Sequence, residues 1–279
     1  MALAYGADAV YLAGDAYGMR AFAGNFDREG LAHAVALAHG QGVRVHVTCN
    51  TLARNEEVAA LPVYLEYLDS IGVDAVIAAG VDVLNLCQRY APHVQVHMST
   101  QTGITNYEMV RMWHELGASR AILARELSLD EVAEICARAP RGMAVEAFVH
   151  GAMCVSVSGR CLLSNYMTGR DANRGACAQP CRYQYALMEE KRPGEYFPVF
   201  EEGGETFILN SRDMCMIDHI PELLAASLHS LKIEGRAKSA YYTGMVTAAY
   251  RHAIDAAAQG LPLDPVWRDE VEKVSHRPY

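Results

Sequence analysis

The sequence predicts an α/β fold, a TIM-type (β/α)8 barrel. Short apolar runs alternate with amphipathic stretches of helical length through the first 150 residues. The runs are continuously apolar, as in parallel strands that are buried on both faces. A glycine followed by Ala or Val and then Asp or Ser precedes several of the runs, which indicates a recurring helix-to-strand turn. These three features favour a barrel built from repeated strand–helix units.

Seven strands are expected, six in the first part of the chain and one late. They are Ala9–Ala13, Val43–Cys49, Ala75–Ala79, Val94–Thr100, Arg120–Ala124, Ala144–His150 and Ser230–Glu234. Helices are expected between them from apolar periodicity and from residues that favour helix ends. They are Asp27–Gln41, Asn55–Ile71, Asn106–Leu116, Ser128–Arg138, in which Ser128 and Glu131 form a capping box, and Lys238–Ala258 after the last strand.

One strand of the eight is unaccounted for. Residues 1–5 resemble the end of a helix with no strand before it, so we expect the first strand and most of its helix to be absent from this sequence. A doubly wound open sheet is the alternative fold. It is less favoured because no Gly-x-Gly-x-x-Gly turn follows an early strand.

The sequence divides into four parts on this interpretation. Residues 1–150 form the barrel without its first strand, and residues 151–229 form a Cys-rich insertion with a small antiparallel β element. Three β-like runs are expected in that insertion, around 183–189, 196–201 and 205–210. Residues 230–258 supply the last barrel strand and its helix, and residues 259–279 form a polar tail. Because so long an insertion in a barrel is usually functional, we expect the site there.

The charge and the hydrophobic pattern exclude some classes of protein. The net charge is −9, from 24 basic and 33 acidic residues, which gives no general attraction to nucleic acid but leaves room for a local basic patch. No apolar run is long enough to cross a bilayer, and the first residues lack the features of a signal peptide. We therefore expect a cytoplasmic protein without membrane contact. Its oligomeric state is left open.

The eight cysteines fall into two groups. Cys49, Cys87 and Cys136 occur singly in apolar segments and are expected in the core. The other five occur in polar, Gly-rich loops, where a purely packing role explains them poorly. They are Cys154, Cys161, Cys177, Cys181 and Cys215. In a reducing compartment such clustering indicates a metal site. An iron–sulfur cluster is favoured over structural zinc, because the two-residue gap typical of zinc cysteine pairs is missing.

Polar side chains follow or end several of the expected strands. Because catalytic groups of barrels project from the C-terminal ends of strands, these side chains are candidates for the site. They are Arg20, His97, Arg125, Glu146, His150, Lys232, Glu234 and Arg236. Lys232 and Glu234 lie on the same side of a strand that should be buried. Charged groups there need partners or a ligand.

Three segments of the sequence resemble a known family. Residues 146–164, EAFVHGAMCVSVSGRCLLS, are similar to the signature of peptidase family U32, the collagenase-like proteins. The segments GRDANRGACAQPCR at 169–182 and SLKIEGR at 230–236 also resemble this family. The resemblance covers essentially the whole chain, and family members start one strand earlier.

The resemblance implies oxygen-independent hydroxylation. Characterised relatives modify bases of tRNA or ribosomal RNA, or ubiquinone precursors, and several hold a 4Fe–4S cluster on four cysteines. Prephenate is implicated as the hydroxyl source for the RNA-modifying members. The ligand spacing of these relatives maps onto Cys154, Cys161, Cys177 and Cys215, with Cys181 as an alternative ligand.

The implied roles of the other candidates follow from their charges. A dicarboxylate such as prephenate would be bound at the barrel mouth through Arg20, His97, Arg125, Lys232 and Arg236, because guanidinium and ammonium groups suit carboxylates. Proton transfer would fall to Glu146, His150, Lys232 and Glu234. Two alternatives remain: a peptidase that uses the same barrel mouth, and a non-catalytic binding protein with a structural zinc. The sequence contains neither His-Glu-x-x-His nor Gly-x-Ser-x-Gly, so the residues give the peptidase no support.

Overall fold

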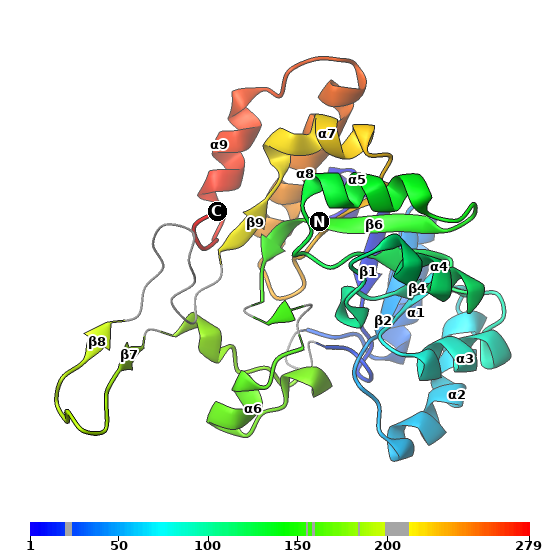
Figure 1. Ribbon diagram of the computed structural model, residues 1–279. Helices are drawn as coiled ribbons and strands as arrows, with labels where there is room; N and C mark the ends of the chain where they lie inside the picture. Colours follow the sequence, from blue (N-terminus) through cyan, green and yellow to red (C-terminus); the bar gives the residue numbers. More distant parts are fainter. Residues whose placement is uncertain (20–23, 155, 158–159, 184, 199–211) are drawn as a thin grey trace.

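Seven parallel strands form the central sheet, in the order β1–β2–β3–β4–β5–β6–β10 (Figure 1). This computed structural model describes the whole chain except residues 20–23, 155, 158–159, 184 and 199–211. Six strands lie within their predicted runs, and β6 extends two residues further. The strands are β1 (Ala9–Leu12), β2 (Arg44–Cys49), β3 (Ala75–Ala78), β4 (Gln95–Met98), β5 (Arg120–Ile122), β6 (Ala144–Ala152) and β10 (Ser230–Ile233).

The sheet curls until its two outer strands border the same groove. Residues Ala9–Leu12 of β1 and Ser230–Ile233 of β10 line this groove, whose volume is about 660 Å³. In the described part of the chain no strand pairs β1 with β10. The curled parallel sheet with alternating helices confirms the predicted barrel class, although the sheet stays open between β1 and β10.

Six helices alternate with these strands. They are α1 (Arg28–His39), α2 (Asn55–Ser70), α3 (Val81–Tyr90), α4 (Tyr107–Glu115), α5 (Leu129–Arg138) and α8 (Ala240–Ala258). The predicted capping box at Ser128 and Glu131 is present, and the Asp27 side chain accepts a hydrogen bond from the Gly30 amide at 2.8 Å. Helix α3 was not predicted, although its buried residues Val83, Leu84 and Cys87 have helical spacing.

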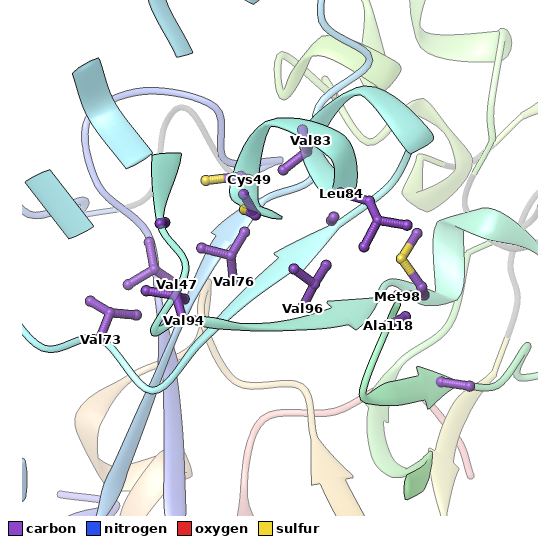
Figure 2. Close-up of a cluster of buried hydrophobic side chains, with 14 of the residues drawn as sticks. Val47, Cys49, Val73, Val76, Val83, Leu84, Val94, Val96, Met98 and Ala118 are labelled. Carbon is purple, nitrogen blue, oxygen red and sulfur yellow. The ribbon is translucent and has the colours of Figure 1, made fainter. Parts of the chain in front are cut away.

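The main core lies between the outer face of the sheet and the helices. Figure 2 shows Val47, Val76 and Val96, from three neighbouring strands, beneath Val83 and Leu84 of α3. Full burial of each such side chain contributes about 1.5–3 kcal/mol. Cys49 and Cys87 are buried in the same cluster, as expected, so their thiols belong to the core.

A second core cluster covers the outer face of β6. It contains residues of α7 (Ile220–Ala225), α8 and α9 (Pro265–Lys273), with Val149 of β6 among them. Strand β9 (Asp213–Cys215) adds antiparallel to the end of β6, where Cys215 lies opposite His150. Neither β9 nor α9 was predicted. The part expected as a polar tail buries Val271 and Val274 against α8, so the end of the chain packs on the barrel.

The Cys-rich segment extends from the C-terminal end of β6. It contains the short helix α6 (Leu163–Thr168), two 3-10 turns at Ala172–Arg174 and Pro180–Arg182, and a hairpin of β7 (Ala186–Leu187) and β8 (Phe197–Pro198) that points away from the barrel (Figure 1). Two of the three predicted β runs coincide with this hairpin. The third, at 205–210, lies outside the described residues. No helix in the described chain is long and apolar enough to cross a membrane.

Candidate functional site

A buried ion triad lies inside the curled sheet. Glu146 of β6 accepts hydrogen bonds from Arg120 Nη1 of β5 at 2.7 Å and from Lys232 Nζ of β10 at 2.9 Å. The three side chains are 4%, 10% and 8% exposed. Burial alone would raise the pKa of Glu146, but the charges of Lys232 and Arg120 outweigh it and hold the pKa well below its usual range. The triad thus carries a net positive charge in the interior.

Aromatic rings and two histidines surround this triad. The Lys232 ammonium lies 4.6 Å from the ring centroid of Tyr11 and 5.5 Å from that of Phe148. His46 and His97 pack edge to face, with centroids 4.6 Å apart. Burial lowers the pKa of His46 to about 4 and that of His97 to about 2, so both rings are neutral at pH 7. They can donate or accept one hydrogen bond each without adding charge.

A second pocket, of about 130 Å³, opens at the C-terminal ends of the strands. Arg125 and Arg236 line it, as do Lys232 and Glu234 from β10 and the residue after it. The Arg125 guanidinium donates to the Ala152 carbonyl at 2.7 Å and lies 4.6 Å from the Phe148 ring centroid. Within the described chain no carboxylate forms an ion pair with Arg125. Its positive charge is therefore available to an anion in this pocket.

Arg236 links the two sides of the open sheet at the same mouth. Its guanidinium donates to Thr48 Oγ1 of β2 at 3.3 Å and to Asn25 Oδ1, beyond β1, at 2.9 Å. Its backbone amide donates to Glu234 Oε1 at 3.2 Å. The side chain is thereby fixed above the interior triad.

Four of the five clustered cysteines line this mouth pocket. They are Cys154, Cys161, Cys177 and Cys181. Burial raises the pKa of the Cys154 and Cys181 thiols, so a nearby cation is needed to hold them as thiolates at pH 7. The pocket therefore gathers soft donor atoms beside the arginines of the barrel mouth.

The Cys-rich segment is fastened to the barrel by several side chains. Arg174 forms two 2.8 Å hydrogen bonds with the carboxylate of Glu57 on α2. Arg160 Nε donates to the Gln101 carbonyl at 2.7 Å, and Arg277 Nη2 donates to the carbonyl of Met153 at 2.9 Å. These contacts hold the thiols over the C-terminal ends of the strands.

Comparison with known proteins identifies the family. The family model for peptidase family U32 matches residues 1–279. The chain belongs to peptidase family U32. The tRNA hydroxylation protein P1 of Bacillus subtilis (strain 168) is 39% identical over 280 residues, which cover 99% of this chain and 66% of that protein. The chain thus spans about two thirds of that relative's length.

Two further matches are a second relative by sequence and a solved structure. The 23S rRNA 5-hydroxycytidine synthase of Escherichia coli (strain K12) is 36% identical over 256 residues, which cover 91% of this chain and 37% of that protein. The solved structure of the U32 peptidase Mk0906 matches with a TM-score of 0.50 at 15% identity, covering 82% of this chain and 86% of that one. At this identity the structural match supports the fold alone.

The U32 fold separates two predicted residues from the mouth. His150 packs against the rings of Tyr242, Tyr250 and Tyr279 on the outer side of β6, where burial lowers its pKa to about 4. Cys215 lies opposite His150, with its Sγ 4.0 Å from the Tyr250 hydroxyl. Neither residue lines the mouth pocket.

A bulge in β6 explains the position of His150. Between β6 and β10, Lys232 pairs with Phe148 but Ile233 pairs with His150, so Val149 is the extra residue. A bulge reverses the alternation of the strand: Glu146 and Phe148 face inward, whereas Val149 packs in the outer cluster with His150 beside it. The sequence shows no sign of this bulge.

Two other predicted residues, His97 and Arg20, are not among the residues that the structure describes at the mouth. His97 lies in the interior beside His46 rather than at the mouth, and Arg20 lies outside the described residues. The sequence does not single out Arg120 as a site residue, because it stands at the start of an expected strand. A charged residue in a buried strand next to the one that carries Glu146 is the signal that could have identified it.

Proposed function

We propose that this chain is an iron–sulfur-dependent hydroxylation protein that modifies an RNA base, with a prephenate-like dicarboxylate as the hydroxyl donor and without molecular oxygen. One observation carries the proposal most: four thiols line a pocket together with Arg125 and Arg236 at the mouth of the barrel. Soft ligands for a cluster and cations for a dicarboxylate are thus available in one place.

The names of two relatives support RNA as the substrate. One is a tRNA hydroxylation protein and the other a 23S rRNA 5-hydroxycytidine synthase, and each is at least 36% identical to this chain. The two names share hydroxylation of RNA but differ in the RNA. The proposal therefore commits to an RNA base, and the deletion experiment below distinguishes tRNA from ribosomal RNA.

The donor set fits an iron–sulfur cluster in its chemistry. The family resemblance implies Cys154, Cys161, Cys177 and Cys215 as ligands, with Cys181 as the alternative. In the structure Cys154, Cys161 and Cys177 line the pocket, so we take the fourth ligand to be Cys181 or Cys215. In the described part of the chain no three Cys, His, Asp or Glu side chains already converge as for a single ion. Cys181 shares the pocket with the first three, whereas Cys215 faces Tyr250, and this favours Cys181. A bound cluster would supply one-electron chemistry at the mouth.

The chain's own residues bind and orient the donor. Arg125 and Arg236 offer two guanidinium groups to two carboxylates, and the pairing of Arg236 with Asn25 and Thr48 fixes one of them in place. Lys232 adds a positive charge beneath them, between the Tyr11 and Phe148 rings. The Glu146 carboxylate is held charged by its two cations, so it is suited to fixing Lys232 rather than to accepting a proton.

Metal analysis of protein purified without oxygen tests the cluster. We expect brown protein with about four irons per chain and a broad visible absorbance. Cys154→Ser, Cys161→Ser and Cys177→Ser should each lose iron, whereas Cys136→Ser, a half-buried cysteine of α5, should retain it. Colourless protein with stoichiometric zinc would refute the proposal as stated.

A pair of variants identifies the fourth ligand. If Cys181 is the ligand, Cys181→Ser loses iron and Cys215→Ser keeps it, and the reverse result assigns Cys215. Equal retention of iron in both variants would show that neither cysteine is needed as a ligand.

The nucleoside profile tests the substrate: deletion of the gene should remove a hydroxylated pyrimidine from tRNA or from ribosomal RNA, as measured by mass spectrometry. An unchanged profile excludes this substrate class.

Peptidase activity is the second candidate, favoured by the name of the family to which the chain belongs. It predicts gelatin cleavage by the purified chain. Cleavage that is lost in Glu146→Gln but kept in Cys154→Ser would favour a peptidase at the interior triad. Absence of cleavage in the wild-type chain would remove this candidate.

A further inference from the structure

Exposed aromatic side chains gather on the Cys-rich segment beside the mouth pocket. The Tyr183 side chain is 56% exposed, and its ring lies 6.4 Å from that of Tyr185. The Tyr185 hydroxyl contacts Met167 Sδ of α6 at 3.6 Å, and the preceding residue on that helix, Tyr166, is 89% exposed. We call Met167, Tyr183 and Tyr185 the aromatic face. A group of rings left in water indicates a surface that is covered by a partner.

The part of this segment that precedes the hairpin loop differs in charge from the rest of the chain. Residues 154–188 contain four arginines and one acidic residue, Asp171, whereas the whole chain carries a net charge of −9. Arg182 donates to Gln179 Oε1 at 2.7 Å, and Arg160 donates to the Gln101 carbonyl. In the described chain neither guanidinium forms an ion pair with a carboxylate. Their charge is therefore available to a polyanion.

The aromatic face continues directly into the mouth pocket. Cys181 and Arg182 line the pocket, and Tyr183 is the next residue in the chain. The 3-10 turn Pro180–Arg182 packs against α6, and the Tyr183 hydroxyl donates to the Ala178 carbonyl at 3.0 Å. The Tyr183 ring and the Arg182 guanidinium are thus held at the edge of the pocket rather than on a separate lobe.

From these contacts we propose that the aromatic face, with Arg182 and Arg160, binds the single-stranded RNA nucleotides that flank the base in the mouth pocket. Bases stack on tyrosine rings, and arginines contact the phosphates that connect them. A single strand fits better than a duplex, because only unpaired bases expose their faces to stack on side chains. A protein partner would use the rings without needing the surplus of arginines. The inference rests on the proposed function, since it concerns the substrate of the same pocket.

Binding of a short fluorescein-labelled oligouridylate to the full chain, followed by fluorescence anisotropy, tests this surface. We expect Tyr183→Ala and Tyr185→Ala each to weaken binding about five-fold or more, while Tyr183→Phe, which keeps the ring, binds like the wild type. Arg182→Ala should lower the slope of log affinity against log salt by about 0.7, the value for one lost phosphate contact with a single strand.

A matched control exists outside the Cys-rich segment. Tyr241 of α8 is 57% exposed, close to the 56% of Tyr183, but it lies beside α9 rather than on the Cys-rich segment. Tyr241→Ala should bind the oligouridylate like the wild type. Each variant should keep the wild-type iron content and melting temperature, so that lost binding is not lost folding. The surface is wrong if Tyr183→Ala and Tyr185→Ala together leave binding unchanged, or if the wild-type chain does not bind the oligouridylate.

The nucleoside profile separates this inference from the proposed function. If the gene deletion removes a hydroxylated pyrimidine but the tyrosine variants bind and restore it normally, the hydroxylation stands and the surface fails. If the deletion leaves all nucleosides unchanged but the tyrosine variants lose binding, the RNA surface stands and the hydroxylation fails. Loss of both binding and restoration in the tyrosine variants supports both.

Discussion

One carboxylate, that of Glu146, neutralises part of the charge of two buried cations. Removing one partner of a buried ion pair leaves an uncompensated charge, which costs about 3–5 kcal/mol. Glu146→Gln should therefore lower the free energy of unfolding by that amount at pH 7, measured by urea denaturation. Because the pKa of Glu146 is depressed in the folded state, its contribution is fully present above the unfolded value of 4.5 and is lost only as the pH falls through the lower folded value. The loss in Glu146→Gln should thus be the same at pH 6 and pH 7.

An exposed pair provides the control for this prediction. Glu108 pairs with Arg111 on α4, and the two side chains are 51% and 57% exposed. Glu108→Gln should cost less than about 1 kcal/mol, because surface ion pairs are screened by water. Equal losses in the two variants would show that Glu146 does not compensate buried charge in the folded protein.

At the level of elements, the close approach of β6 and β10 depends on Gly151. Its φ is +116°, and a Cβ there would lie 2.6 Å from the Glu234 carbonyl oxygen. Gly151→Ala therefore combines the penalty of a positive φ, about 1–2 kcal/mol, with overpacking of about 1–3 kcal/mol. We expect a loss of about 3 kcal/mol in urea denaturation. A shift of the Glu234 backbone would also disturb the mouth pocket, so the iron content should fall.

Gly169 separates the two contributions. It has a φ of +71° at the end of α6, but a Cβ there would have nothing within 4 Å. Gly169→Ala should cost only the conformational part, about 1–2 kcal/mol. If Gly151→Ala were no worse than Gly169→Ala, the contact between β6 and Glu234 would not constrain the fold.

The elements predicted from the sequence are those with strong periodicity. The apolar runs identified all seven strands of the parallel sheet, because the inner strands are buried on both faces and the outer strands β1 and β10 are partly buried. Strand β9 was missed because three residues carry no periodic signal, and α9 because most of its face is polar, with Val271 the one buried residue within it. The separation of Cys215 from the mouth follows from the pairing of β9 with β6. That pairing is a long-range contact, which spacing along the chain does not reveal.

The residues at the mouth could be predicted from the sequence, whereas the position of His150 could not. In a barrel, polar groups collect at the C-terminal ends of the strands. The mouth pocket is lined, as predicted, by Arg125, Lys232, Glu234 and Arg236. The position of His150 depends on a one-residue bulge at Val149, which no residue type in the sequence indicates.

For the whole molecule, we expect the backbone amides along the open side of the sheet to be the least protected from hydrogen exchange. Strands β3 and β4 are paired on both sides, and Ala75, Ala78 and Met98 are fully buried. Strands β1 and β10 each pair with one parallel neighbour and border the groove of about 660 Å³. Local opening of a strand that has few buried contacts requires less free energy than opening of the core.

Native-state hydrogen exchange followed by mass spectrometry tests this difference. Peptides that contain β1 and β10 should exchange at least about ten-fold faster than peptides that contain β3 and β4, the ratio that an opening free energy lower by about 1.4 kcal/mol produces. The exchange of β3 and β4 should approach the rate set by global unfolding. Destabilising the whole fold with Glu146→Gln should speed β3 and β4 more than β1, since β1 already opens locally. Uniform protection across the four strands would show that the groove does not weaken the sheet.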